Sequence, residues 1–155
     1  MVRFFIYLCL LASIGAQAQR PRLYNPAADA AKDVAALLVR AKEENKNVLL
    51  QIGGNGCVMC YRFNAFVQTD TALKKLAEEN YIIYHLNHSR ENKNERYLKT
   101  IGAPQRSGLP TFAVLDTAGR LLHTQSGTEL QRGNGYDTDK VKTFFMQWAP
   151  QPPTF

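Results

Sequence analysis

Residues 48–60 read VLLQIGGNGCVMC. The apolar run 48–52 predicts a short buried strand. The glycine-rich residues 53–56 predict a loop, because glycine adopts almost any backbone dihedral angles. A helix is expected to follow from Cys57 to about Gln68. Two cysteines three positions apart, placed between a strand and a helix, can form a disulfide and open it again. The stretch therefore indicates redox chemistry.

The N-terminus has the features of a secretory signal peptide. Arg3 supplies positive charge, residues 4–14 form an apolar run of 11 residues, and residues 16–18 (AQA) match a small-x-small cleavage site. The run is too short to span a membrane, which disfavours an uncleaved anchor. Cys9 lies inside the run rather than after it, which disfavours a lipoprotein. We expect residues 1–18 to be a signal peptide and the mature protein to be periplasmic or otherwise exported, with no stable membrane span.

The mature chain has the size and charge of one ordinary domain. Removal of 18 of the 155 residues leaves 137, a common length for a single domain. Loss of Arg3 lowers the net charge from +6 to +5. A nucleic-acid-binding protein would gather its basic residues on one face, but here they alternate with acidic residues, as in residues 90–99. We therefore expect no nucleic-acid partner, and we expect a monomer.

Cys57 and Cys60 are the two cysteines expected in the mature chain, since Cys9 would leave with the signal peptide. Small exported domains that lack a large core usually carry several disulfides. A disulfide that closes so short a loop removes little entropy from the unfolded chain. Stabilisation of the fold is therefore a poor reason for the pair to exist, and this again favours a reactive role.

Helices and strands are expected to alternate along the rest of the chain. Asn25 and Pro26 predict the start of the first helix as N-cap and first helical residue. Further helices are expected at residues 57–68, 70–79, 92–101 and 138–148, and strands at residues 48–52, 81–86, 112–115 and 121–125. Strands separated by helices pair in parallel, and the last two strands form a hairpin that adds an antiparallel edge. The predicted fold class is α/β, with a central mixed sheet flanked by helices on both faces.

This order of elements resembles the thioredoxin fold. The resemblance rests also on the Cys-x-x-Cys motif at the first strand-to-helix junction and on Gly-Leu-Pro-Thr at residues 108–111, just before the hairpin. It covers residues 25–148 and implies a thioredoxin-like domain over residues 19–155, similar to exported bacterial proteins that face the periplasm. In that family the proline of the second motif is cis and faces the cysteines, a role that would fall to Pro110. The backbone of Leu109 would then pair with a bound substrate peptide.

Several positions depart from the thioredoxin pattern. Gly56 stands where thioredoxins usually have a tryptophan, and Gln51 replaces a buried aspartate that assists proton transfer. Val58 and Met59 replace the usual Gly-Pro between the cysteines, and Tyr61 replaces a lysine. The redox motif is thus kept without the residues that tune it in thioredoxin. Tyr61 is either a helix surface residue, which we favour, or a lid over the disulfide.

The two cysteines are expected to have different roles. Cys57 begins a helix, where unpaired backbone N–H groups and the helix dipole stabilise a thiolate, so it is the expected nucleophile. Cys60 lies one turn further in and is the expected resolving thiol. Gly56 should leave space beside Cys57, and we include it with Leu109 and Pro110 among the residues expected to bind substrate. Gln51 cannot relay a proton as a carboxylate does, so the base for Cys60 would be water, the Cys57 thiolate or another group.

The expected activity is therefore that of a thiol–disulfide oxidoreductase. It would reduce protein disulfides outside the cytoplasm without a cofactor, receiving electrons from a thiol–disulfide donor. The preference for reduction over oxidation rests on the resemblance alone, and the sequence leaves the substrate, the donor and the reduction potential open.

Two other function classes compete with this reading. Two cysteines at this spacing could form half of a zinc site, but the sequence has no second Cys-x-x-Cys, and His85, His88 and His123 lack ligand spacing. A thioredoxin-fold chaperone or binding module with little redox turnover is the main alternative. The loop 53–56 lacks the Gly-Lys-Ser/Thr ending of a phosphate-binding loop, which excludes that site.

Overall fold

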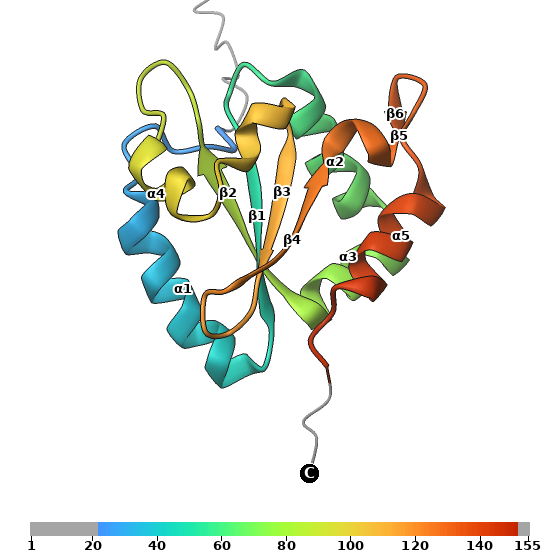
Figure 1. Cartoon of the computed structure of the whole chain (residues 1–155). Helices are drawn as coiled ribbons and strands as arrows, with labels where there is room; N and C mark the ends of the chain where they lie inside the picture. Colours follow the sequence, from blue (N-terminus) through green and yellow to red (C-terminus); the bar gives the residue numbers. More distant parts are fainter. Residues whose placement is uncertain (1–21, 152–155) are drawn as a thin grey trace, which may run out of the picture.

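The fold is built on a four-stranded mixed sheet with the strand order β2-β1-β3-β4 (Figure 1). The computed structural model describes residues 22–151, so the predicted signal peptide lies outside the described residues. The strands are β1 (Asn47–Gly53), β2 (Tyr81–Asn87), β3 (Thr111–Leu115) and β4 (Leu121–Ser126). β1 pairs with β2 in parallel, as expected, and β3 and β4 form the expected hairpin. The expectation that strands separated by helices pair in parallel is wrong at β3, which follows α4 (Glu95–Thr100) and runs antiparallel to β1.

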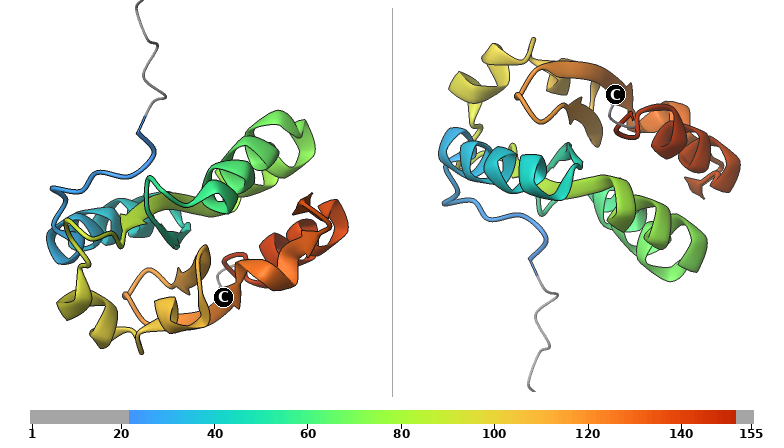
Figure 2. Two further views of the ribbon diagram at one scale, coloured as in Figure 1. Left: turned by 90° about the horizontal axis from the view of Figure 1, so that it is seen from above. Right: turned by 90° about the horizontal axis from the view of Figure 1, so that it is seen from below.

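Helices cover both faces of this sheet (Figure 2). One face carries α1 (Ala30–Glu44) and α4 (Glu95–Thr100), and the other carries α2 (Val58–Thr69), α3 (Thr71–Asn80) and α5 (Thr138–Gln147). Two short 3-10 helices, η1 (Pro104–Ser107) and η2 (Gly127–Leu130), and a small hairpin of β5 (Gln131–Arg132) and β6 (Gly135–Tyr136) complete the described elements. The predicted α/β class with a mixed sheet and two helical layers is confirmed.

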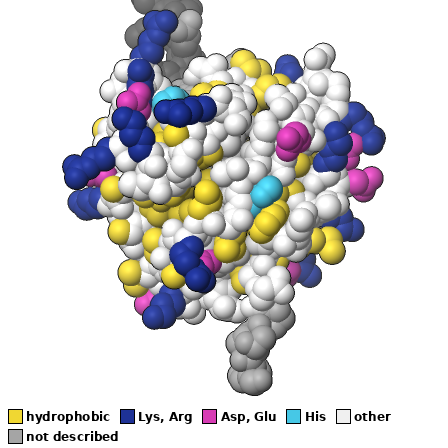
Figure 3. Space-filling model, in the orientation of Figure 1, with side chains coloured by type: hydrophobic (Ala, Val, Ile, Leu, Met, Phe, Trp, Pro, Cys, Tyr) yellow, Lys and Arg dark blue, Asp and Glu magenta, His cyan; other side chains and the backbone are white. Residues whose placement is uncertain are grey.

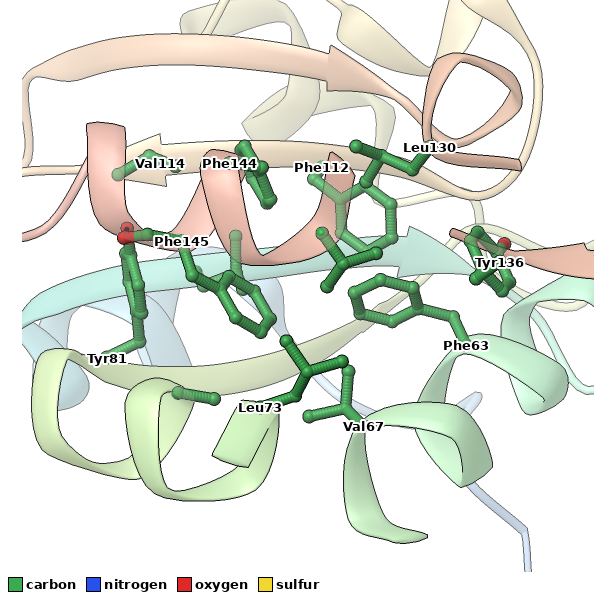
Figure 4. Packing of buried hydrophobic residues seen from close by; sticks show 13 residues of the cluster. Phe63, Val67, Leu73, Tyr81, Phe112, Val114, Leu130, Tyr136, Phe144 and Phe145 are labelled. Carbon is green, nitrogen blue, oxygen red and sulfur yellow. Dashed lines mark hydrogen bonds between the residues drawn. The ribbon is translucent and has the colours of Figure 1, made fainter. Parts of the chain in front are cut away.

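Strand β1 runs through the centre of the core, and all seven of its residues are buried. Because side chains alternate along a strand, Val48, Leu50 and Ile52 pack under α1 and α4, while Leu49 packs under α2, α3 and α5. The second of these layers is rich in aromatic rings, and Phe63 of α2 meets Phe112 of β3 with ring centroids 4.4 Å apart (Figure 4). This packing fixes α2, and therefore the cysteine motif, against the sheet.

The first helix begins later than predicted. The structure starts α1 at Ala30 with Asp29 as its N-cap, and the Asp29 carboxylate accepts hydrogen bonds from the backbone N–H groups of Ala31 and Lys32. Asn25 and Pro26 instead form a turn, closed by a 3.2 Å hydrogen bond from the Ala28 N–H to the Asn25 carbonyl. A side-chain oxygen that satisfies two free N–H groups caps the helix better than a proline at its first position.

The helix predicted at residues 92–101 is also shorter in the structure. α4 spans only Glu95–Thr100, because the preceding asparagines hydrogen-bond to the backbone and hold a loop. Asn92 Nδ2 donates to the Ala28 carbonyl at 2.9 Å, and Asn94 Nδ2 donates to the Asn87 carbonyl at 2.9 Å. The strands β5 and β6 are not among the elements predicted from the sequence. The other predicted helices and strands lie within two residues of their predicted bounds.

No helix among residues 22–151 is both long enough and apolar enough to span a membrane.

Candidate redox site

Cys57 and Cys60 form a disulfide at the N-terminus of α2, as the spacing predicts. The two sulfurs are 2.04 Å apart and the two Cα atoms 5.3 Å apart. Cys57 is the N-cap of the helix, in an extended conformation, and its sulfur accepts a 3.2 Å hydrogen bond from the Cys60 N–H. The loop before it closes through a 2.9 Å hydrogen bond from the Cys57 N–H to the Gly54 carbonyl.

The two sulfurs lie in different surroundings. Cys57 is half-buried, whereas Cys60 is 0 % exposed. A thiolate on Cys57 would sit where the free N–H groups of the first helical turn point, and these groups and the helix dipole stabilise negative charge. A charge on Cys60 would have no contact with water. The geometry therefore suits Cys57 to attack an external disulfide and Cys60 to act only on Cys57.

An open cleft of about 580 Å³ lies beside Cys57. Its walls come from residues 56–59, from the loop 88–91 that follows β2, and from Leu109. Val58 and Leu109 are 62 % and 38 % exposed, which is unusual for large apolar side chains and gives the cleft an apolar rim. The cleft brings together the redox sulfur and two of the three residues that the sequence analysis assigns to substrate binding, Gly56 and Leu109.

Gly56 lines this cleft, whereas Pro110 is not among its lining residues. A Cβ atom on Gly56 would meet nothing within 4 Å, so the space beside Cys57 is open. The Leu109–Pro110 peptide bond is cis, and Pro110 is buried. The Pro110 carbonyl accepts a 2.9 Å hydrogen bond from the Gly127 N–H. A Cβ atom on Gly127 would lie 2.5 Å from that carbonyl oxygen, so only glycine allows this close approach.

A buried polar group lies behind the disulfide. Gln51 Nε2 donates to the Tyr24 hydroxyl at 3.0 Å and to the Cys60 carbonyl at 2.9 Å. Burial raises the pKa of Tyr24 above its ordinary value, so its hydroxyl stays protonated. The sequence analysis missed Tyr24, because it lies in a short irregular segment far from the cysteines in the chain and belongs to no motif.

Tyr61 is not the free surface residue that the sequence analysis favours. Its hydroxyl donates to Asn55 Oδ1 at 2.8 Å and accepts a 3.1 Å hydrogen bond from the Leu23 N–H. Asn55 also bonds both backbone groups of Tyr24, at 3.0 Å to its N–H and 2.9 Å to its carbonyl. Tyr61 and Asn55 thus fasten the segment before α1 to the loop that carries Cys57.

The three histidines lie apart from one another. His85 on β2 pairs in register with Gln51, His88 Nδ1 lies 2.8 Å from the Lys93 carbonyl, and the His123 ring stacks on Trp148 at 4.3 Å. Burial lowers the pKa of His85 to about 4, so this ring is neutral at neutral pH. Within residues 22–151 no group of three or more Cys, His, Asp or Glu side chains could hold a metal ion.

The charged side chains are mixed over the surface. On the face seen in Figure 3, Lys and Arg side chains lie scattered around the edge of the molecule with Asp and Glu among them. Several form ion pairs across one helical turn, such as Arg40 with Glu44 on α1 and Lys74 with Glu78 on α3. Such pairs are typical of solvated helix surfaces.

Comparisons with known proteins agree with the fold. Among solved structures, the chain matches a disulphide isomerase from Xylella fastidiosa Temecula1 with a TM-score of 0.70 and 22 % sequence identity, over 80 % of this chain and 94 % of that chain. It matches the oxidised C-terminal domain of DsbD from Neisseria meningitidis with a TM-score of 0.55 and 20 % identity, over 78 % of this chain and 97 % of that chain. At these identities the likeness speaks for the fold alone. No curated protein matches the sequence.

A family model gives the assignment. The model described as Thioredoxin-like matches residues 29–117, which is more than half of the chain and includes β1, the cysteine motif and the segment that carries Pro110. The mixed sheet, the two helical layers and the disulfide at the N-terminus of α2 agree with this match. The chain therefore belongs to the thioredoxin-like family.

Proposed function

We propose that the protein is a thiol–disulfide oxidoreductase that reduces protein disulfides outside the cytoplasm. The observation that carries the proposal is the pairing of a half-buried Cys57 at a helix N-terminus with a fully buried Cys60, beside an open cleft. The disulphide isomerase and the DsbD domain among its structural neighbours support a redox role for this arrangement.

The reaction starts from the reduced pair. The Cys57 thiolate attacks one sulfur of the substrate disulfide, a bond forms between the two sulfurs, and the other substrate sulfur leaves as a thiolate that takes up a proton. The Cys60 sulfur, having lost its proton, then attacks Cys57. The Cys57–Cys60 bond forms as the bond to the substrate breaks. Two electrons and two protons pass to the substrate, and a thiol donor must restore the dithiol.

The cleft suits an extended peptide as the substrate. Val58 and Leu109 offer apolar contacts on its rim, and Gly56 leaves the approach to Cys57 free. Among the described residues the backbone N–H and carbonyl of Leu109 have no backbone hydrogen bond, so both can pair with a peptide. Substrate binding through the Leu109 backbone and cleavage at Cys57 would place the scissile disulfide in the cleft.

Export of the protein is part of the proposal. It rests on the charge, apolar run and cleavage pattern of residues 1–18. Sequencing of the N-terminus of protein from the periplasm should give Gln19 as the first residue. Protein that keeps Met1 and stays in the cytoplasm would contradict export. That result would leave the proposed thiol–disulfide chemistry unaffected.

Reduction of insulin disulfides tests the activity. Wild-type protein with a chemical thiol donor should reduce insulin, and Cys57→Ser should abolish the reaction because no other described sulfur can start it. Equal, negligible rates in both proteins would instead favour a chaperone or binding module. Titration of the wild-type pair against glutathione then gives the direction: a strongly oxidising potential would contradict the reducing role.

A further inference from the structure

We propose that the Tyr24 hydroxyl donates a hydrogen bond to the Cys60 sulfur when the disulfide opens, and that this bond stabilises the Cys60 thiolate that releases the substrate. This rests on the proposed function and gives the buried cysteine a specific partner. Gln51 cannot act as an acid or a base toward Cys60. Tyr24, from another part of the chain, would instead stabilise the Cys60 thiolate by a hydrogen bond.

The first argument is the position of the two atoms. A Cβ atom built on Gly53 would lie 2.5 Å from the Cys60 sulfur and 2.5 Å from the Tyr24 hydroxyl oxygen. The two atoms are therefore no more than about 5 Å apart, and both lie beside the position where Gly53 has no side chain. Both side chains are 0 % exposed, so water does not compete for the contact. Opening the disulfide frees the Cys60 sulfur to move toward the hydroxyl.

The second argument is the hydrogen-bonding capacity of Tyr24. A tyrosine hydroxyl can accept hydrogen bonds and donate one. Gln51 Nε2 uses its two hydrogens on the Tyr24 oxygen and on the Cys60 carbonyl. Tyr24 is therefore the acceptor in its bond with Gln51, and within residues 22–151 no acceptor takes the Tyr24 proton. A buried donor is costly to leave without an acceptor, and the Cys60 sulfur is the candidate that the geometry offers.

The third argument is the charge around Cys60. The titratable side chains near Tyr24 and Cys60 are Cys57, Tyr61, Tyr136 and His85. The His85 ring meets Tyr24 edge-on at 5.6 Å, and because burial lowers its pKa to about 4 it brings no positive charge. Burial raises the pKa of Tyr24, so Tyr24 is a donor and not a base. Its hydroxyl is thus the group that offsets the cost of a buried thiolate.

The chain also holds Tyr24 in place for this task. Asn55 bonds the Tyr24 N–H at 3.0 Å and its carbonyl at 2.9 Å, and Asn55 belongs to the loop just before Cys57. The backbone of Tyr24 is therefore tied to the redox loop, while its side chain reaches behind the disulfide. Gln51 acts as a positioning residue, because its amide orients the Tyr24 hydroxyl toward Cys60.

The bond would act in the second step of the reaction. Cys60 passes its proton to a base such as the substrate thiolate released in the first step, and the Tyr24 hydroxyl, which keeps its own proton, stabilises the Cys60 thiolate that remains. That thiolate attacks the Cys57 sulfur, the Cys57–Cys60 bond forms, and the substrate leaves as a thiolate that is protonated by water. The attack of Cys57 on the substrate does not involve Tyr24.

The test measures the pKa of the Cys60 thiol in the full chain carrying Cys9→Ser and Cys57→Ser. Cys60 is then the one cysteine that remains. The ultraviolet absorbance of the thiolate, followed against pH, gives this pKa. Tyr24→Phe should raise it by about one unit or more, since a hydrogen bond to a charged group is lost. An unchanged pKa in folded Tyr24→Phe would overturn the proposal. Should Tyr24→Phe fail to fold, Gln51→Met is measured in its place. It should also raise the pKa of the Cys60 thiol, by less than Tyr24→Phe, and an unchanged pKa would again overturn the proposal.

Tyr81→Phe is the matched control. Tyr81 is a buried tyrosine on the face of the sheet that α2, α3 and α5 cover. Its hydroxyl donates to the Phe145 carbonyl at 2.8 Å, away from the cysteines. Its loss should leave the Cys60 pKa unchanged, and a rise equal to that of Tyr24→Phe would contradict a specific contact. The titration needs no turnover, so its outcome is independent of insulin reduction. If Tyr24→Phe raises the pKa of Cys60 but the wild-type protein does not reduce insulin, the proposed function is contradicted and the hydrogen bond from Tyr24 is not.

Discussion

Gly56 is the residue that most separates this site from that of thioredoxin. It lies next to Cys57, and a Cβ atom built on it would meet nothing within 4 Å. The same residue lines the cleft beside Cys57 and a second cavity of about 670 Å³ that is bordered by Tyr61 and Arg62. The absence of a large side chain thus leaves the nucleophile open to bulky partners.

Gly56→Trp should place a bulky side chain beside Cys57 and narrow this approach, and the backbone can accept the substitution because a Cβ atom there meets nothing within 4 Å. We expect a bulky maleimide to modify the reduced variant about tenfold more slowly than the wild type, a change in activation free energy of about 1.4 kcal/mol. Iodoacetamide, which is small, should react at nearly the wild-type rate. An equal slowing of both reagents would mean that the substitution changed the thiolate rather than the access to it.

The sequence singles out the two cysteines of the site more readily than the residues that lie behind them. The spacing of Cys57 and Cys60 predicts the disulfide that the structure shows, because this signal is local, and the role of Leu109 in substrate binding stays a prediction. Tyr24 gives no such signal, since it lies 36 positions from Cys60 in the chain and the buried amide of Gln51 links the two by hydrogen bonds to the Tyr24 hydroxyl and the Cys60 carbonyl. Gln51 could be recognised as a departure from the family pattern, but its partner becomes visible only in the folded chain.

The junction of α2 and α3 is fixed by a single residue. Asp70 is the C-cap of α2 and the N-cap of α3, and its carboxylate accepts hydrogen bonds from the N–H groups of Ala72 and Leu73, both at 3.0 Å. This turn directs α3 back along the sheet and brings Leu73 into the core beside Val67 and Phe63 (Figure 4).

Asp70→Ala should lower the free energy of unfolding by about 1 kcal/mol, because two N–H groups lose their acceptor. Denaturant titration measures this loss. Asp70→Asn is the control, since its amide oxygen can still accept, and it should retain most of the stability. Alanine and asparagine variants of equal stability would show that the cap contributes little.

Local signals predict most element boundaries, and they fail where side chains compete. Asp70 and Asp137 each stand just before an apolar helical pattern, and each caps its helix in the structure. Asn25 and Asp29 both fit a cap, and the structure selects Asp29. Asn94 begins α4 late because its side chain reaches the Asn87 carbonyl and the Ala30 N–H, a long-range preference that sequence patterns do not carry.

Among residues 22–151, His85 is a titratable group whose burial links the stability of the molecule to pH on the acidic side of neutrality. His85 lies on β2 behind the redox site, and burial lowers its pKa from 6.5 to about 4. Between these two pH values the unfolded chain binds a proton at this position and the folded chain does not. Acidification therefore favours unfolding in this window, and below about pH 4 the group causes no further loss.

Replacement of His85 by phenylalanine should remove this dependence while keeping an aromatic ring against Tyr24. Wild-type protein should lose about 2 to 3 kcal/mol of stability between pH 6.5 and pH 4 through this histidine. Denaturant titrations at several pH values measure how the free energy of unfolding depends on pH. The free energy of unfolding of the wild type minus that of the variant should fall as the pH falls. His88→Gln, on the nearby loop, controls for loss of a histidine. A constant difference would mean that His85 binds a proton in the folded protein.

The architecture as a whole serves one purpose, to hold a reactive sulfur at the edge of a rigid sheet. The aromatic layer around Phe63 fixes α2, the loop from β1 places Cys57 at the helix N-terminus, and the segment at Leu109 supplies the opposite wall of the cleft. The order of elements allowed the α/β class and the β3–β4 hairpin to be predicted, but not the antiparallel pairing of β3 with β1, because strands separated by a helix usually cross over in parallel. The cleft itself could not be predicted, since its walls come from separate loops.

Capture of the mixed disulfide tests the central claim most directly. A reduced Cys60→Ser protein, with Cys9→Ser to remove the other thiol, is mixed with insulin and analysed by intact mass spectrometry. Our account predicts a covalent adduct of one insulin chain on Cys57, since the resolving thiol is gone, and no adduct when Cys57→Ser replaces Cys60→Ser. Failure of Cys57 to form the adduct, or an equal adduct through Cys60 in the Cys57→Ser protein, would contradict the account.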